Sequence, residues 1–100
     1  MKITVESPRI RLSEKLQKQI ENKFSHLEKL SDRIVNCDVI LKKEKNNKQK
    51  NFTVEARLLV PKELLFATEK AETFEMALDK LINNMQQQLR RWKEEFEEVR

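Results

Sequence analysis

Cations and amides recur at helical spacing in residues 73–96, and they are the side chains best suited to bind a partner. The apolar residues of this segment form one stripe, made of Phe74, Ala77, Leu78, Leu81, Met85, Leu89 and Trp92. At 100° per residue, Lys80, Gln87 and Arg91 follow one another along a flank of that stripe. A helix with one anchored face and one basic, amide-rich face suits a phosphate backbone, although an ordinary solvated face has the same pattern.

A second basic surface is predicted on a helix that begins after Ser13, its N-cap, and ends near Leu30. The buried stripe of this helix consists of Leu16, Ile20, Phe24 and Leu27. One edge of the stripe carries Glu14, Glu21 and Glu28, and the far side carries Lys15, Lys18, Asn22 and Lys29. Part of this sorting could simply stabilise the helix through i,i+4 ion pairs. If the two helices pack side by side, their basic faces form one surface.

Catalytic chemistry finds little support in the residue types. His26 is the only histidine, and the chain contains neither tyrosine nor glycine, so a glycine loop around phosphate is excluded. Cys37 lies in an alternating apolar run, where a small core residue is expected rather than a nucleophile. The sequence has no Cys/His cluster for zinc, and adjacent glutamates near residue 95 have no fixed geometry for a metal. We therefore expect that the protein is not an enzyme and that it binds neither a metal nor a cofactor.

The net charge of +4 is unevenly distributed along the 100 residues. The last seven residues contain four glutamates and one arginine, which leaves residues 1–93 with 20 Lys+Arg against 13 Asp+Glu. This pattern predicts a single basic domain over residues 1–93 and a short acidic tail over residues 94–100, with nucleic acid as the leading partner class. The single cysteine and the absence of an apolar run near membrane-span length favour a cytoplasmic protein that does not bind membranes. We also expect the protein to be a monomer in solution.

Alternating apolar and polar residues predict four strands, at 2–6, 34–43, 52–60 and, in a shorter form, 64–68. Together with the helices, they give the order β-α-β-β-β-α. The strand–helix–strand connection should make the first two strands parallel, and the short later links should make the others antiparallel. Each helix has one apolar stripe, so both should cover one face of a four-stranded mixed sheet in a two-layer α+β sandwich. The opposite face, open to water, should carry Thr4, Glu6, Asp38, Lys42, Thr53, Glu55 and Arg57.

The link between the second and third strands is rich in lysine. In a chain without glycine, Asn46 and Asn47 are the expected positions of positive φ in this hairpin. Residues 42–50 contain no aromatic side chain, so the segment could contact phosphates but could not read bases. The same segment could equally be a solubilising hairpin tip.

Several segments fit one known pattern in their order and spacing. They are residues 1–5 (MKITV), 27–30 (LEKL), 32–34 (DRI) and, most specifically, 74–93, where Gln88, Leu89, Arg90, Arg91 and Lys93 match and Trp92 takes the place of another aromatic. With these segments the chain resembles, over essentially its whole length, the ribosome hibernation-promoting factors, which are also called ribosome-associated inhibitors or sigma-factor modulation proteins.

The resemblance implies a fold like that of double-stranded-RNA-binding domains. It also implies binding to the small ribosomal subunit in the mRNA/tRNA channel near the decoding region, which would block translation and preserve inactive ribosomes in starvation and stationary phase. The partners would be ribosomal RNA and neighbouring ribosomal proteins. The chain resembles the short class, whose members either pair ribosomes beside a separate ribosome modulation factor or keep single ribosomes inactive. The RNA-binding residues implied are Lys15, Lys18, Asn22, Lys29, Lys80, Asn84, Gln87, Gln88, Arg90, Arg91 and Lys93.

Two positions depart from the family pattern. Asn84 and Gln87 stand where that pattern favours lysine and arginine, which removes two charges from the flank that also carries Lys80 and Arg91. We expect all four side chains to share one environment. Amides can still bind phosphate, ribose or base edges, but without charge assistance.

Two other functional classes stay open. The domain could be a general binder of double-stranded RNA, although such domains lack the initial strand that this sequence predicts. It could also be a protein-interaction module whose C-terminal helix uses Trp92 and Phe96 as anchors.

Overall fold

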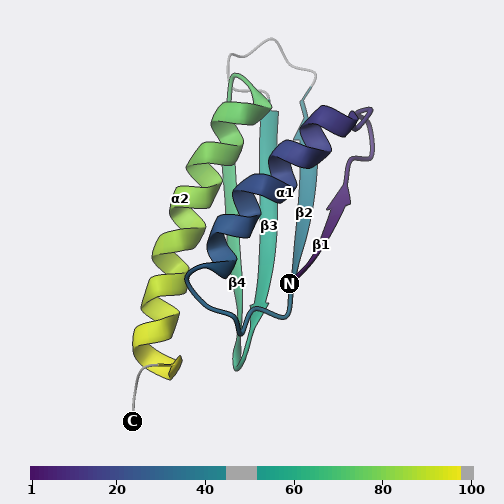
Figure 1. The fold of residues 1–100 in the computed structure, drawn as a ribbon. Helices are drawn as coiled ribbons and strands as arrows, with labels where there is room; N and C mark the ends of the chain where they lie inside the picture. The colour runs from purple at the N-terminus through teal and green to yellow at the C-terminus, as the bar shows by residue number, and fades with distance from the viewer. Residues whose placement is uncertain (45–51, 98–100) are drawn as a thin grey trace.

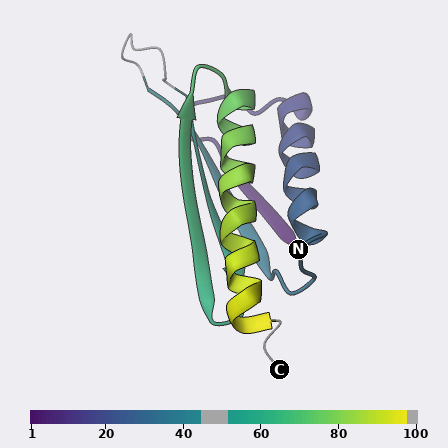
Figure 2. The same ribbon diagram turned by 90° about the vertical axis from the view of Figure 1, so that its left-hand side faces the viewer.

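The computed structural model describes residues 1–44 and 52–97, which form two layers (Figure 1). One layer is a sheet of β1 (Lys2–Glu6), β2 (Asn36–Lys43), β3 (Phe52–Val60) and β4 (Glu63–Ala71), in the order β1-β2-β3-β4. The other layer contains α1 (Glu14–Glu28) and α2 (Phe74–Trp92), which lie on the same side of the sheet (Figure 2). A π-helical turn, η1 (Lys93–Glu97), extends α2. The predicted β-α-β-β-β-α two-layer α+β sandwich is confirmed.

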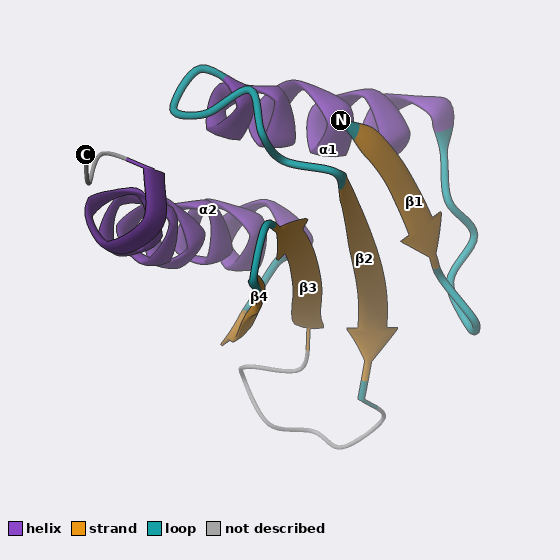
Figure 3. Ribbon diagram, turned by 90° about the horizontal axis from the view of Figure 1, so that it is seen from below, coloured by secondary structure: helices purple, strands orange, loops and turns teal. Residues whose placement is uncertain are grey.

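The strand directions follow from the connections. β1 runs parallel to β2, with Lys2 opposite Asn36 and Glu6 opposite Ile40, and α1 forms the crossover between them. β2 and β4 both pair with β3 in antiparallel register. Seen from below, the helices cover one face of the twisted sheet and the other face has no cover from the described residues (Figure 3). Any partner of the helices therefore approaches from the side opposite to the open face.

Side-chain caps determine where both helices begin. The Ser13 hydroxyl accepts a hydrogen bond from the Leu16 N–H at 3.1 Å, and the Thr73 hydroxyl accepts one from the Met76 N–H at 3.1 Å. Each cap satisfies a backbone donor that has no partner within its helix. α1 ends at Glu28, slightly before the predicted limit, because the next two residues bond in a tighter turn to carbonyls three positions back.

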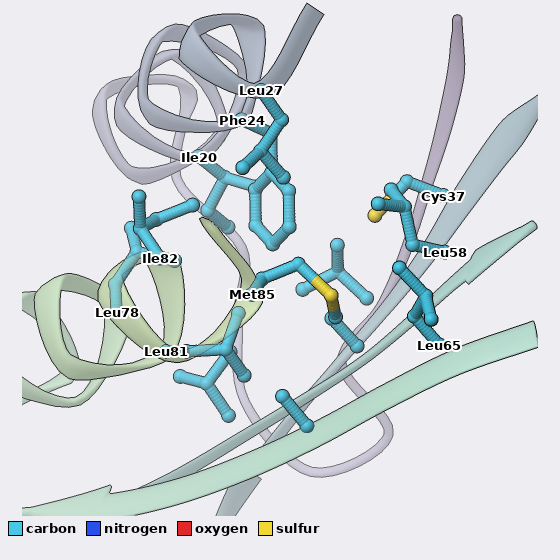
Figure 4. Packing of buried hydrophobic residues seen from close by; sticks show 14 of the residues in the cluster. Ile20, Phe24, Leu27, Cys37, Leu58, Leu65, Leu78, Leu81, Ile82 and Met85 are labelled. Carbon is cyan, nitrogen blue, oxygen red and sulfur yellow. The ribbon is translucent and has the colours of Figure 1, made fainter. Parts of the chain in front are cut away.

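The core lies between the helices and the inner face of the sheet (Figure 4). It brings together Ile20, Phe24 and Leu27 of α1, Leu78, Leu81, Ile82 and Met85 of α2, and Cys37, Leu58 and Leu65 of the sheet. The prediction that Cys37 is a core residue is confirmed, since its side chain is fully buried. Burial, and to a lesser extent the neighbouring Asp38 carboxylate, raise the pKa of the Cys37 thiol to about 12. The thiol is therefore neutral and inert at physiological pH.

The sheet differs from the prediction at three places. β4 extends over nine residues rather than five, because it pairs with β3 along its whole length. β2 begins two residues later than predicted, at Asn36. Thr53 was expected to face water but is only 5% exposed, since Lys42 and Lys70 flank it on the adjacent strands and their aliphatic stems can cover it.

The described turn with positive φ lies between β3 and β4. Lys62 has a φ of 72° and follows Pro61, whose ring fixes φ at the preceding turn position. The predicted positions of positive φ, Asn46 and Asn47, lie outside the described residues. The predicted limit between a domain over residues 1–93 and an acidic tail stays a prediction, although the helical path continues through η1 to Glu97.

Candidate nucleic-acid interface

The basic side of α1 points away from the sheet. On its acidic edge, Glu28 forms an ion pair with the Met1 amino group at 2.8 Å. The opposite side carries the predicted residues Lys15, Lys18, Asn22 and Lys29, all of which are exposed. Within residues 1–44 and 52–97, no hydrogen bond or ion pair engages these four side chains. They are therefore available to an external anion.

The C-terminal half of α2 provides the second group of cations. Arg90 and Arg91 lie in the last turn of α2, are exposed, and have no polar partner in the described part of the chain. Lys93, in contrast, is half-buried and donates a hydrogen bond to the Leu30 carbonyl, just after α1. This bond ties the end of α2 to the end of α1. We call Lys15, Lys18, Lys29, Arg90 and Arg91 the two-helix basic face.

Polar contacts join the two helices nearer their N-termini. Lys23 forms an ion pair with Asp79 at 2.5 Å, and the Gln19 amide donates to Glu75 at 3.4 Å. The N-terminal part of α2 is therefore acidic and neutralises a lysine of α1. No local sequence pattern indicated these contacts, because the partners are 56 residues apart.

The side chains on one flank of α2, which were expected to share one environment, have different surroundings in the structure. Lys80 donates a hydrogen bond to the Lys70 carbonyl at 2.9 Å, and Asn84 donates to the Glu69 carboxylate at 3.0 Å. Both acceptors belong to β4. Gln87 is exposed and has no such bond within the described residues. The expectation of a common environment for these side chains was therefore wrong.

Gln88 also contacts β4 rather than facing outward. Its amide nitrogen lies 2.8 Å from the Phe66 carbonyl and 2.8 Å from the Asn84 side-chain oxygen. Arg91 borders a small hollow of about 70 Å³ beside Trp92 and Glu95. The sequence-predicted residues thus separate into an outward-facing set and a set bonded to the sheet.

Trp92 does not provide an exposed anchor for a protein partner. Its side chain is 1% exposed, and its indole N–H donates to the Pro61 carbonyl at 2.9 Å. Phe96 is 38% exposed.

The open face of the sheet exposes Leu59, Leu64 and Phe66, which occupy adjacent positions on β3 and β4. These apolar residues were not singled out by sequence, because they alternate with core positions of similar type.

A larger hollow, of about 530 Å³, lies between the β1–α1 connection and the end of β2. Its lining includes Arg9, Lys42 and Lys43. Lys42 pairs with Glu55 at 2.8 Å, and the Lys43 ammonium lies 5.3 Å from the ring centroid of Phe52. Of these three cations, only Arg9 has no partner in the described residues.

Neither a metal centre nor a membrane span is found where the structure describes the chain. No group of three or more His, Cys, Asp or Glu side chains in residues 1–44 and 52–97 could hold a metal ion. No helix in those ranges has the length and apolar character needed to cross a bilayer.

Comparison with known proteins found a matching family model and solved structures of similar fold. The family model described as "Sigma 54 modulation protein / S30EA ribosomal protein" matches residues 3–97. A ribosomal subunit interface protein from Coxiella burnetii is 24% identical with a TM-score of 0.78, and the match covers 93% of this chain and 98% of that one. The N-terminal domain of Thermus thermophilus Protein Y is 18% identical with a TM-score of 0.81, and the match covers 92% and 99%. At these identities the two structures show a shared fold.

The comparison with curated protein sequences gave no match. The family model nevertheless spans almost the whole chain, including both helices and all four strands. The protein therefore belongs to the Sigma 54 modulation protein / S30EA ribosomal protein family, the ribosome hibernation-promoting family that its residues predicted.

Proposed function

We propose that this protein binds the small ribosomal subunit in the channel for mRNA and tRNA, near the decoding region, and blocks translation there. Ribosome association and translation regulation belong to its family. The observation that carries the finer proposal is the two-helix basic face, whose five cations are exposed and have no partner within the described residues. Such a face suits the phosphates of ribosomal RNA.

The mechanism is steric and electrostatic. Neutralised phosphates supply the affinity, and the fixed spacing of two packed helices supplies shape recognition. Lys93 and the Lys23–Asp79 pair support that spacing, since each joins the two helical segments. A domain held in the channel excludes mRNA and tRNA without making or breaking a covalent bond. Ribosomes blocked in this way are preserved, either singly or as pairs formed with a separate modulation factor.

The test measures binding to purified small subunits by sedimentation, with and without bound mRNA and tRNA. We expect binding to empty subunits, release at high salt, and exclusion by mRNA and tRNA already bound. Chemical footprinting should protect ribosomal RNA around the decoding region. Unchanged binding to subunits with a filled channel would place the site elsewhere on the ribosome.

Duplex RNA distinguishes the general RNA binder from the ribosome-specific one. A short duplex in molar excess over the subunits should compete poorly, because shape recognition needs the ribosomal site. Full competition by duplex RNA would favour the general binder.

A further inference from the structure

Three side chains of α2 form a row against β4, and we call Lys80, Asn84 and Gln88 the edge row. They are spaced four residues apart, so they lie on one side of the helix. β4 is the last strand of the sheet, and no strand of the described residues lies beside its other edge. α2 lies along this strand (Figure 1, Figure 3). The edge row therefore faces the place where an unpaired strand edge would otherwise be open.

The hydrogen bonds of Asn84 and Gln88 form a continuous chain to β4. Asn84 donates to the Glu69 carboxylate and accepts from Gln88, and Gln88 also donates to the Phe66 carbonyl. An amide group offers two donor hydrogens and one acceptor oxygen. Gln88 uses both of its donors in these bonds, and Asn84 uses its oxygen and one donor. Both side chains are half-buried, which leaves little capacity for an external ligand.

We propose that Asn84 and Gln88 are positioning residues, which hold α2 on the β4 edge and so present Arg90 and Arg91, rather than RNA ligands. This inference rests on the proposed function. Through its bond to the Phe66 carbonyl, Gln88 also occupies a backbone acceptor of the edge strand, which such strands otherwise offer to other chains.

The two roles of Asn84 predict opposite effects of a change at Glu69. If Asn84 contacts RNA directly, loss of the Glu69 anion should leave ribosome affinity unchanged or raise it. If Asn84 acts through Glu69, loss of that carboxylate should weaken binding as loss of Asn84 does. Glu69→Gln keeps an acceptor oxygen, so it should retain most of the affinity that Glu69→Ala loses.

The experiment measures the Kd for small subunits at one salt concentration, at a temperature where circular dichroism finds every variant folded. We expect Asn84→Ala and Glu69→Ala each to weaken binding about three- to tenfold, the effect of one net hydrogen bond. The double variant should bind small subunits no more weakly than whichever single variant binds more weakly, because both changes break the same hydrogen bond. Asn83→Ala, the adjacent exposed asparagine, is the matched control and should stay within about twofold. Weakening by Asn84→Ala without weakening by Glu69→Ala would overturn the proposal, and so would no weakening by either.

Hydrogen exchange separates this proposal from the proposed function. The backbone amides of α2 should exchange faster in Asn84→Ala, Gln88→Ala and Glu69→Ala than in Asn83→Ala. Equal exchange in all four variants would overturn the positioning role. If the wild-type protein failed to bind small subunits, the proposed function would fail, while the exchange rates would still decide whether the edge row holds α2.

Discussion

Reversal of two charges at the end of α2 should abolish most ribosome binding without unfolding the domain. Arg90 and Arg91 are exposed and have no polar partner in the described residues, so Arg90→Glu with Arg91→Glu removes no hydrogen bond or ion pair found there. Both lie in the last turn of α2, where cations interact favourably with the helix dipole. Each reversal loses the favourable interaction of a cation, about 0.3–1 kcal/mol, and adds an unfavourable one of similar size, so the free energy of unfolding should fall by no more than about 4 kcal/mol for the pair.

The expected loss of binding free energy is larger. If each arginine makes one charge-assisted hydrogen bond to phosphate, worth about 1.5–3 kcal/mol, the pair accounts for about 3–6 kcal/mol. That corresponds to a Kd higher by a factor of about 10² to 10⁴. Two fewer neutralised phosphates should also reduce the salt slope by about 1.4–1.8. The assays are sedimentation with small subunits and inhibition of translation in a cell-free system.

A matched control separates local contact from net charge. Lys2→Glu with Arg57→Glu makes the same change in total charge on the open face of the sheet, where both side chains are exposed. This control should bind within about threefold of wild type, because exposed charges more than a Debye length from the RNA are largely screened. The reasoning is refuted if the arginine variant inhibits translation as well as wild type, or if the control loses as much affinity.

Four further outcomes are expected. Log affinity of the wild-type protein should fall with log salt at a slope of about −3.5 to −4.5, if the five cations of the two-helix basic face each neutralise one phosphate; a flat response would exclude this mechanism. Leu81→Ala, at a fully buried position, should lower the free energy of unfolding by about 2–5 kcal/mol in urea titrations, while it leaves the surface charges in place. Gln87→Arg should steepen the salt slope by about 0.7–0.9, whereas Asn84→Lys should pair with Glu69 and change it little, which sedimentation over a salt series will compare. The pKa of the Cys37 thiol is about 12 in the folded protein, against an ordinary value of 9.0. The resulting contribution to stability is therefore complete below pH 9 and is lost as the pH rises toward 12. The urea midpoint should fall more steeply above pH 9 in wild type than in Cys37→Ala.

The fold could be predicted because the decisive signals are local. Alternation placed β1, β2 and β3, and the helical stripes ending at Leu27 and Trp92 placed both helices on one face. The end of β4 was missed because Glu69 and Lys70 are consecutive polar residues, which interrupt the alternation of apolar and polar positions. Their strand conformation comes from pairing with β3 and from bonds to α2, neither of which a local pattern records.

The candidate site was predicted only in part. A helical wheel identified the outward side of α1 correctly, because no side chain of residues 1–44 and 52–97 pairs with Lys15, Lys18 or Lys29. On α2, Gln87 and Gln88 were assigned together to the RNA-binding set, Gln88 through its match to the family pattern, although the two lie about 100° apart on the wheel. One is exposed and the other bonds to a strand carbonyl, and that difference depends on the strand that happens to lie beside the helix.

The place of α2 in the core has a consequence for synthesis of the protein. α2 supplies seven of the 21 buried apolar side chains among the described residues, and it is translated after all four strands. Until α2 has emerged, the inner faces of β3 and β4 lack their cover, so a nascent chain cannot complete its core. The same helix carries Arg90 and Arg91. A ribosome that translates this protein therefore meets no complete two-helix basic face on its own nascent chain before α2 has been made.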